Sequence, residues 1–581
     1  MPRDGHRLRD PFVLGTILAT LANLALVWGH AHVAAQDHFN HLASMRALRG
    51  LWEADPFFVT HFTVVRRAVP DLLAEAIWFV ALRPLGEVAA GKALVSLYAV
   101  GLPLAWWAFL RRFCEGATTM LPLAPIATMS LYYSLGSTNY LLGLPLFLLG
   151  AVAWDRVREG PRAVGIFVAV VVATWFAHVY DYVLLMIFVF AQVVTRAVQR
   201  RPPTRHEWAA GLALLAGFAW AARAVLSTES EWAASEPPRF DLDPRRLAHV
   251  PEIALFFRSG GGTRYAILAL AAVAATSLVA NRTRRGGLRA TVLPAALLTL
   301  AALWLAPVSI GVEESIKPRF GVAVVLLAMA ALGEVAGRWH RALAAVVFVG
   351  LFAYKWNDER VFHDRFDRRV AEARQGPIAA LPRHARVLPA SWLRRHVLGE
   401  TAFHHLADLA VLERDVYLPD LFAAPGQQIL RHRRPWPGEV RAPDELTAAR
   451  LVGFDYVWAQ SDDPEALVAG VAGCVERVTS ATNVALYRVR HDAPCVEGER
   501  QVRRAPTALV PRRHHEPLPR GDDAGHPAAR PLPGGRHALL PPGAGRAARY
   551  GDRRRPLVVV AQLEGARRQR AHPLGLAPHR P

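Results

Sequence analysis

An aspartate and two histidines stand just after the first long apolar run of the sequence. In HVAAQDHFNHLASMRAL, which begins at His32, they are Asp37, His38 and His41. If this stretch is helical, the three side chains share one face, because positions three and four apart lie above one another. Desolvation and histidine neighbours can tune a carboxylate near a membrane surface into a general base. We therefore predict a general base at Asp37; the alternative is that Asp37 caps the following helix.

A second polar pair interrupts a long apolar stretch. His178 and Asp181, in FAHVYDY, lie in the middle of the run 163–195, which is too long for one membrane span. We divide the run there into two spans joined by a shallow turn. Ionisable side chains so close to hydrocarbon usually face a cavity or a partner, so both are candidate substrate-binding residues. The alternative is that they pair with each other.

Cationic side chains stand beside two other apolar runs. Lys317 and Arg319 occur in EESIKPRF, directly before a run, and Arg239 occurs in PPRFDLDPRRL. Ammonium and guanidinium groups at a membrane surface suit a phosphate group. The alternative for each is ordinary anchoring among lipid headgroups.

Metal and nucleotide motifs are scarce. The HExxH pattern is absent, and we expect FHHLAD, at 403–408, to be a solvated helix face. A divalent metal would therefore require Asp37 together with a second acid. The sequence has no GxxxxGK[ST] motif, and the glycines of RSGGGTRY, at 258–265, follow no predicted strand, so we expect no nucleotide site.

These residues must be positioned by membrane helices. The chain of 581 residues is 52% hydrophobic with a positive mean hydropathy of +0.18, which is more apolar than ordinary soluble domains. Most of its apolar runs approach the ~20 residues that a bilayer core requires. We predict about eleven spans, near 11–34, 91–110, 118–135, 139–155, 163–177, 180–195, 208–226, 263–280, 290–309, 319–336 and 341–355.

The arginine-rich connections predict the orientation. They alternate along the chain, and short loops rich in Lys and Arg stay on the cytoplasmic side. The connections that contain the candidate site residues then face outward, as does everything after Trp356. This assignment requires the short run 70–85 to be an interfacial or re-entrant helix of the first outer loop, 35–90; a true span there would invert everything downstream.

The formal net charge of +20 would suggest nucleic acid in a soluble protein, but cytoplasmic loops account for much of it, so we expect no nucleic-acid partner. Residues 501–581 contain no lysine and are dense in Arg, Pro, Ala, Gly and His. Without periodicity they cannot bury a core, and we interpret them as a disordered tail or as translation of a non-native frame.

The sequence predicts an outward α/β domain at residues 356–500, which lie between the membrane domain, 1–355, and the tail. Strand-like sequences occur at 385–390, 454–460 and 482–489, between helical stretches near 358–375, 403–414 and 444–452. Cys474 and Cys495 both fall in this domain, where an oxidising exterior would let them form a disulfide; two free thiols are the alternative. The fold class is thus a mainly α, polytopic helical membrane protein with an extracytoplasmic C-terminal α/β domain.

This plan resembles that of the GT-C superfamily, integral-membrane glycosyltransferases that use polyprenyl-phosphate sugars, and within it the protein mannosyltransferase and aminoarabinose transferase families. The resemblance lies in the first span, the outer loop that opens with QDHFNHLASMRALRG, about ten further spans and the outward domain, and it covers roughly residues 10–490. YYSLGSTNYLLGLPLFLLGAVAW and TWFAHVYDYVLLMIFVFA also look like segments of bacterial polytopic proteins with this plan.

The resemblance implies a multi-pass protein of the cytoplasmic membrane that transfers a sugar from polyprenyl phosphate to a lipid or glycan acceptor. Asp37 would match the family's catalytic acid in the first outer loop. The second acid expected nearby is replaced by His38, and Glu53 and Asp55 fit it loosely. No Trp-Trp-Asp motif occurs. A transporter or lipid flippase, and a non-catalytic envelope protein, are the alternative functions.

Overall fold

The computed structural model describes most of the chain up to residue 497. The described residues are 9–65, 70–114, 117–226, 239–244, 247, 250–258, 262–282, 292–307, 309–310, 313–314, 317–335, 337–392, 402–421, 428–433, 440 and 442–497. The tail 501–581, for which we predict disorder or a non-native frame, lies outside them.

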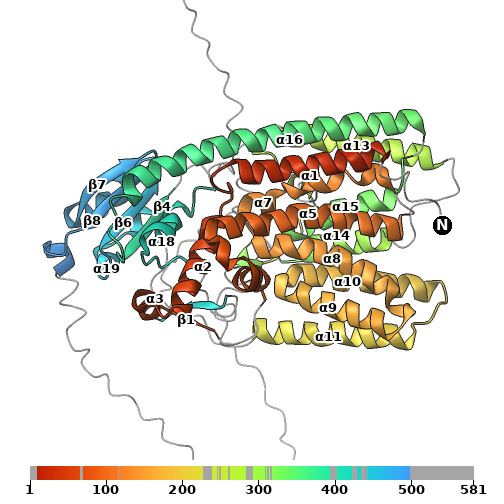
Figure 1. Cartoon of the computed structure of the whole chain (residues 1–581), viewed down its shortest axis with the longest axis horizontal. Coiled ribbons are helices and arrows are strands. Elements are labelled where there is room, and N and C mark those ends of the chain that lie inside the picture. Colours follow the sequence, from red (N-terminus) through yellow and green to blue (C-terminus); the bar gives the residue numbers. More distant parts are fainter. Residues whose placement is uncertain are drawn as a thin grey trace, which may run out of the picture.

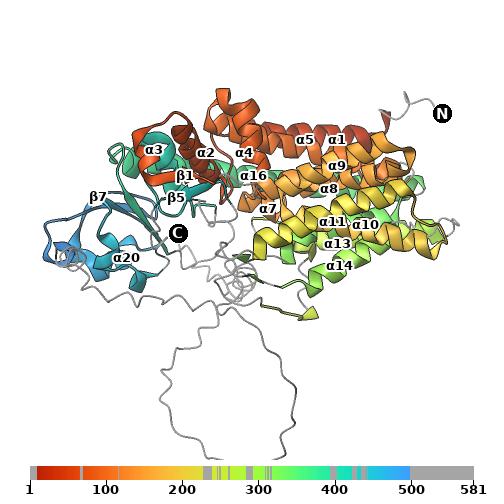
Figure 2. The same cartoon turned by 90° about the horizontal axis from the view of Figure 1, so that it is seen from below.

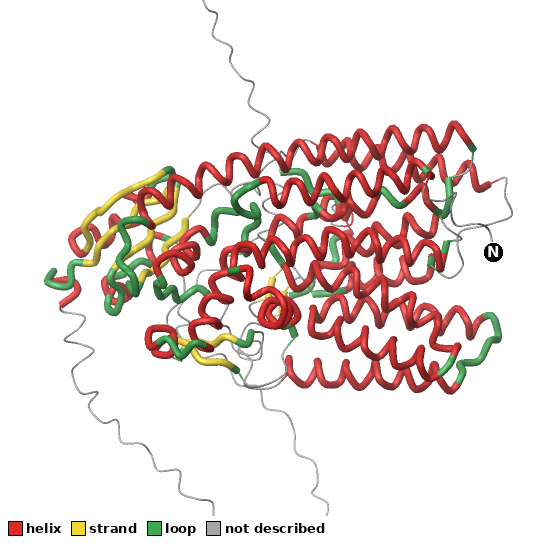
Figure 3. Tube along the Cα trace, viewed as in Figure 1, coloured by secondary structure: helices red, strands yellow, loops and turns green. Residues whose placement is uncertain are grey.

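A bundle of long apolar helices forms one end of the molecule (Figures 1 and 3). Five helices in the described residues are long and apolar enough to cross a membrane. They are α1 (Pro11–Gly29), α5 (Glu87–Phe113), α8 (Thr138–Arg156), α10 (Val179–Val198) and α13 (Gly262–Arg282). Figure 2 shows the same bundle from below. The chain is therefore a mostly helical, multi-pass membrane protein.

The remaining expected spans correspond to helices that do not meet the same criterion. They are α9 (Pro161–Ala177), α11 (Arg205–Leu226), α14 (Leu293–Leu305), α15 (Gly321–Leu332) and the first part of α16 (Arg338–Ala373). Short elements lie between them: η5 (Val157–Glu159), α12 (Val250–Ala254), β2 (Ser309–Ile310), β3 (Glu313–Glu314) and η7 (Lys317–Phe320). Helix length and composition thus support five spans and leave the prediction of about eleven unconfirmed.

The expected span 118–135 is not one continuous helix. The segment divides into η4 (Thr118–Met120), α6 (Leu123–Thr128) and α7 (Leu131–Leu135). Pro122 precedes α6, and Ser130 takes an extended conformation with φ −68° and ψ 176°. The apolar composition of the segment reflects burial inside the bundle, where neighbouring protein can satisfy a broken helical backbone.

Helix α16 continues without a break through residues 355 and 356, where the sequence predicts a domain boundary. This helix has 36 residues and so a length of about 54 Å at 1.5 Å per residue. Figure 1 shows it running from the helical bundle to the sheet of the C-terminal region. After Trp356, charged side chains replace apolar ones along α16. The helix continues because no proline or glycine interrupts it at this change of composition.

Residues 35–90, for which the sequence predicts the first outer loop, fold into short elements beside the bundle. They are α2 (His38–Trp52), α3 (Pro56–His61), β1 (Phe62–Val64), α4 (Leu73–Ile77), η2 (Trp78–Leu82) and η3 (Arg83–Leu85). Strand β1 pairs antiparallel with β5 (Leu430–His432), with Phe62 opposite His432. The loop is therefore joined to the C-terminal region by backbone hydrogen bonds.

The C-terminal region contains a four-stranded sheet in the order β4-β6-β8-β7. Its strands are β4 (Val387–Trp392), β6 (Tyr456–Ser461), β7 (Val475–Ala481) and β8 (Val484–Val489). β4 and β6 are parallel, and the other pairs are antiparallel. The connections contain η8 (Arg374–Ile378), η9 (Leu406–Asp408), α18 (Leu409–Arg414), η10 (Pro443–Glu445), α19 (Ala448–Leu451), α20 (Pro464–Val468) and η11 (Ala469–Cys474). A disulfide joins Cys474 to Cys495, whose Cα atoms are 6.1 Å apart.

A stack of three phenylalanines ties the loop, α16 and the C-terminal region together. The ring centroid of Phe366 lies 5.6 Å from that of Phe39 on α2 and 5.2 Å from that of Phe403. All three rings are buried, and burying each contributes roughly 1.5–3 kcal/mol. This apolar stack fixes the start of α2 against the turn 402–408.

Candidate active site

The backbone of Asp37 is held by the last residues of α7 (Leu131–Leu135). The amide nitrogens of Gln36 and Asp37 donate hydrogen bonds of 3.0 and 2.9 Å to the carbonyl oxygens of Ser134 and Leu135. Gly136 lies against this contact in the left-handed region, with φ +78°, and a Cβ atom there would lie 2.9 Å from the nitrogen of Asp37. Only glycine fits this approach without displacing the backbone of Asp37.

The side chain of Asp37 does not cap α2. Asp37 occupies the N-cap position, but its carboxylate makes no capping hydrogen bond. Its Oδ1 atom instead lies 3.6 Å from Nε2 of His405, and the side chain remains 22% exposed. The carboxylate is therefore both accessible and oriented by a histidine from the C-terminal region, and the capping alternative is not supported.

His405 is surrounded by three carboxylates. Its Nδ1 atom lies 3.2 Å from Oδ2 of Asp408 and 3.9 Å from Oδ2 of Asp420, on the ring side that does not face Asp37. Asn40 of α2 donates a 3.1 Å hydrogen bond to the carbonyl oxygen of Asp420 and so fixes that turn. The expectation that 403–408 is a solvated helix face was wrong, because His405 and Asp408 are buried at the junction between α2 and the C-terminal region.

The three acids decide the protonation of His405. Burial acts to lower the pKa of His405, but Asp408, Asp37 and Asp420 outweigh it and raise the pKa to about 10. At neutral pH the ring is then an imidazolium between three carboxyl groups. His405, Asp408 and Asp420 also offer ligand atoms that all lie within 4.8 Å of one another. One imidazole and two carboxylates suit a divalent cation such as Mn²⁺ or Zn²⁺, which would have to displace the imidazolium proton.

His38 lies away from this cluster, against α5. Its ring packs on Gly91, where an added Cβ would lie 2.9 Å from Cε1 of His38. Burial, together with the nearby His41, lowers the pKa of His38 to about 3, so the ring is neutral. Among the described contacts, none joins its side chain to Asp37.

His41 leads into a second polar cluster. Its Nδ1 atom lies 3.6 Å from Oε1 of Glu75 on α4. Asn139 donates hydrogen bonds of 3.0 Å to Oε2 of Glu75 and 2.8 Å to the carbonyl oxygen of Asp71, and it accepts one from the nitrogen of Ala74. Asn139 therefore positions Glu75 of α4 and the backbone of Asp71, which precedes α4, rather than serving only as a packing residue.

His178 joins the same cluster through Asp71. It is the N-cap of α10, where its Nδ1 atom accepts a hydrogen bond from the nitrogen of Tyr180. Nε2 then carries the proton and lies 3.6 Å from Oδ1 of Asp71. The alternative in which His178 pairs with Asp181 is thus not what the structure shows.

Asp181 and Arg319 complete the cluster. Asp181 is fully buried, and neither carboxylate oxygen has a hydrogen-bond partner among the other described residues. Arg319 interacts electrostatically with Asp181, and its guanidinium lies 4.8 Å from the ring centroid of Tyr180 and 6.0 Å from that of Tyr132. Tyr132 is in α7, whose last residues hold the backbone of Asp37, so both clusters border the 131–139 segment.

The other predicted cations and acids lie elsewhere or outside the described residues. Arg239 is exposed, in a segment that Trp304 of α14 contacts through a 3.0 Å hydrogen bond to the carbonyl oxygen of Leu242. Lys317 begins η7, but its side chain lies outside the described part of the structure. Asp55 caps α3 through the nitrogen of Phe57, and Glu53 pairs with Arg49, so neither acid contacts Asp37 in the described residues.

Sequence reasoning missed His405, Asp408, Asp420, Asn40, Glu75 and Asp71. The i, i+3 spacing of His405 and Asp408 was a usable signal, because such positions share a helical face. The approach of Asp420 to this pair, and of the pair to Asp37, depends on tertiary packing that no local pattern contains.

Comparison with known proteins gives a likeness in structure. Neither a protein-family model nor a curated protein matches the sequence. The chain is similar to the crystal structure of ArnT from Cupriavidus metallidurans bound to undecaprenyl phosphate, at 12% identity and a TM-score of 0.48. The match covers 83% of this chain and 98% of the ArnT chain.

Proposed function

We propose that the chain is a membrane glycosyltransferase that moves a sugar from a polyprenyl-phosphate donor to an acceptor hydroxyl of a lipid or glycan at the outer face of the cytoplasmic membrane. The observation that carries the proposal is the placement of Asp37. Its carboxylate is accessible and does not cap α2. It lies 3.6 Å from a buried, charged histidine, at the place where the apolar helices meet the C-terminal region. Such a carboxylate can accept a proton from a hydroxyl group.

The reaction follows from this geometry. Asp37 accepts the proton of the acceptor hydroxyl, whose oxygen attacks the anomeric carbon of the donor sugar. The bond between that carbon and the phosphate oxygen breaks, and the electron pair leaves with the polyprenyl phosphate. Attack opposite the leaving group inverts the anomeric centre. His405 keeps the carboxylate oriented toward the acceptor, which is a positioning role.

Arg319 is the described cation best placed to stabilise the departing phosphate. It lies between Tyr132 and Tyr180, beside the buried Asp181, so its charge is held in a partly dry environment where electrostatic stabilisation is strong. Lys317 stands two residues before it in the sequence. His41 and His178, each beside an acid, are the proposed contacts for sugar hydroxyls.

A divalent cation fits the proposal at His405, Asp408 and Asp420. A cation bound there would supply a fixed positive charge next to Asp37. Without a cation, the imidazolium of His405 supplies that charge. In either form, Asp408 and Asp420 hold a positive group against the catalytic carboxylate.

The buried Asp181, whose carboxylate oxygens have no hydrogen-bond partner among the described residues, favours a second candidate function. Ionisable side chains within membrane helices are typical of transport pathways, so a polytopic lipid transporter or flippase would also use such a buried carboxylate. Transport does not by itself require an accessible carboxylate at Asp37, and we therefore prefer the transferase.

Mass spectrometry of envelope glycolipids and glycans from a deletion strain tests the function. The strain is complemented with the wild type, with Asp37→Asn or with Glu53→Gln, an exposed acid of the same loop, at equal protein levels. A transferase predicts that the wild type and Glu53→Gln restore a missing sugar and that Asp37→Asn does not. Full restoration by Asp37→Asn would contradict the catalytic role. Unchanged sugars with a lipid displaced between leaflets would favour the transporter.

A further inference from the structure

A non-helical segment joins α1 to α2 and leads directly to Asp37. Its backbone groups cannot pair within a helix, so other parts of the chain must hold them. The nitrogens of Gln36 and Asp37 bond to the end of α7. The earlier part of the segment, 31–34, is held instead by ionisable side chains of α16 and by Arg258.

Both backbone groups of Ala34 are paired with buried side chains. Nη2 of Arg258 donates a 2.5 Å hydrogen bond to the carbonyl oxygen of Ala34, and the nitrogen of Ala34 donates one of 3.4 Å to Nε2 of His363. One helical turn further along α16, Asp367 accepts hydrogen bonds of 2.8 and 3.2 Å from the backbone nitrogens of residues 31–32. The segment is therefore fixed up to three residues before the candidate catalytic carboxylate.

The guanidinium of Arg258 is held in one orientation. Its Nε atom donates a 3.1 Å hydrogen bond to Oε2 of Glu359, which is fully buried and accepts another of 2.9 Å from Nζ of Lys355. Its Cζ atom lies 3.9 Å from the ring centroid of Phe362. A planar guanidinium can bond a carboxylate and a carbonyl group together. Because these partners all belong to α16, the bond from Arg258 to the segment is fixed relative to that helix.

His363 is present as the tautomer that accepts a hydrogen bond from the segment. Its Nδ1 atom lies 2.9 Å from the carbonyl oxygen of Glu359, which can only accept, so Nδ1 carries the proton. Burial lowers the pKa of His363 to about 4, so at neutral pH Nε2 is unprotonated. Nε2 accepts from the nitrogen of Ala34 and from the hydroxyl of Tyr133 on α7, 3.3 Å away. His363 thus joins α16, α7 and the segment.

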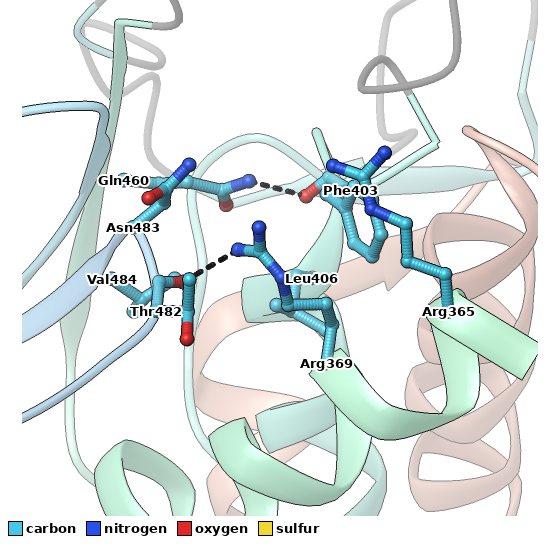
Figure 4. A pocket seen from close by; sticks show the side chains of 8 residues that line it. All are labelled: Arg365, Arg369, Phe403, Leu406, Gln460, Thr482, Asn483 and Val484. Carbon is cyan, nitrogen blue, oxygen red and sulfur yellow. Dashed lines mark hydrogen bonds between the residues drawn. The ribbon is translucent and has the colours of Figure 1, made fainter. Parts of the chain in front are cut away.

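Helix α16 also supports the turn that contains His405, through the phenylalanine stack. Figure 4 shows two hydrogen bonds beside Phe403. Nη1 of Arg369 donates one of 3.1 Å to the carbonyl oxygen of Thr482, and Nε2 of Gln460 donates one of 2.7 Å to the carbonyl oxygen of Phe403. Both halves of the candidate active site are therefore anchored to one helix.

We propose that Arg258 and His363 are positioning residues: by holding the peptide groups of Ala34, they keep the carboxylate of Asp37 where it reaches both His405 and an acceptor hydroxyl. Neither side chain has to contact the substrate for this role. The consequence for sugar transfer rests on the proposed function, whereas the hold on the segment can be measured without activity. A displacement of about 1 Å at a reacting group can lower a rate by about 100-fold.

Hydrogen–deuterium exchange of the purified full-length protein in detergent, followed by mass spectrometry, measures the hold on the segment. Arg258→Met removes the hydrogen bond to the segment but leaves Glu359 paired with Lys355, so the variant should fold. Peptides that cover 31–38 should exchange at least about tenfold faster than in the wild type.

Substitutions of His363 test the same point independently, even if Arg258→Met folds poorly. His363→Leu removes the acceptor and should also raise the exchange of 31–38 by about tenfold. His363→Gln can place an amide oxygen close to the position of Nε2 and should keep the wild-type exchange. Arg196→Gln is the matched control, because it removes a partly buried arginine of α10 whose ion pairs are with acids of α8 and α11, and it should leave 31–38 unchanged.

Sugar restoration in the deletion strain, at equal protein levels, tests the consequence. Arg258→Met and His363→Leu should lower it by about tenfold or more, whereas His363→Gln and Arg196→Gln should not. Wild-type exchange of 31–38 in both Arg258→Met and His363→Leu would overturn the proposal, as would full restoration by both. If Asp37→Asn itself restores the sugar, the transferase mechanism fails, and the exchange of 31–38 alone decides whether the two residues hold the segment.

Discussion

The carboxylate of Asp37, at the N-cap position of α2, lies 3.6 Å from Nε2 of His405, in the C-terminal region. The contact depends on two further elements: the end of α7, which holds the backbone of Asp37, and α16, whose Phe366 stacks between Phe39 and Phe403. A candidate catalytic residue and its partner thus become neighbours only when the membrane helices and the C-terminal region pack together.

His405 predicts a specific dependence of stability on pH. Its pKa is about 10 in the folded protein against 6.5 as the ordinary value, so the folded state binds more protons between these pH values. The resulting stabilisation is complete below pH 6.5 and is lost as the pH rises through 10. The loss should amount to a few kcal/mol, because the group is buried among three acids.

Thermal unfolding in detergent with a chelator present, between pH 6.5 and 10, measures this effect. The wild type should lose more stability across the range than His405→Gln, which cannot change its charge. His404→Gln provides the matched control, because it removes the neighbouring histidine and should retain the wild-type slope. Parallel curves for the wild type and His405→Gln would show that His405 is not charged in the folded protein.

A divalent cation should compete with the proton of His405. Because the imidazole must be deprotonated to bind metal, apparent affinity should rise by up to about tenfold per pH unit between pH 7 and 10. We expect Mn²⁺ or Zn²⁺ to raise the melting temperature of the wild type, and Asp408→Asn to abolish the shift. Asp462→Asn, an exposed acid of the same region, should keep it. Equal shifts in all three proteins would place the metal elsewhere.

Local patterns in the sequence predicted the helices and strands better than they predicted the contacts between them. The strand-like sequences at 385–390, 454–460 and 482–489 overlap β4, β6 and β8, because alternating apolar residues are a local signal. Apolar composition could not show that 118–135 is divided into short helices, since a broken buried segment and a continuous helix have the same hydropathy. The partner of His178 could not be predicted for another reason: Asp71 comes from a distant part of the chain, and sequence spacing contains no such information.

Gly136 should be essential for the position of Asp37. An alanine there would place Cβ 2.8 Å from the nitrogen of His38 and 2.9 Å from that of Asp37, at a φ of +78° that disfavours a side chain. We expect Gly136→Ala to cost about 1–3 kcal/mol and to reduce sugar restoration in the deletion strain. Gly15→Ala in α1, where nothing lies within 4 Å of the added Cβ, should be neutral or slightly stabilising. Full restoration by Gly136→Ala would show that Asp37 tolerates displacement.

The cysteines test the side of the membrane on which the C-terminal region lies. The chain has three cysteines: Cys474 and Cys495 form a disulfide, and Cys114 is a buried free thiol. Disulfides persist in oxidising compartments and are rare in the reducing cytosol. If the region is extracytoplasmic, protein trapped with acid directly from cells and denatured should take up one maleimide-polyethylene glycol label, and three after reduction. A Cys474→Ser/Cys495→Ser variant should take up one label under both conditions, which calibrates the gel shifts.

Three labels on the wild type without reduction would mean that Cys474 and Cys495 are both free thiols in cells, and the C-terminal region would then be better placed on the cytoplasmic side. That result would also move Asp37 to the cytoplasmic face, because α2 packs against α18 and Asp37 contacts His405.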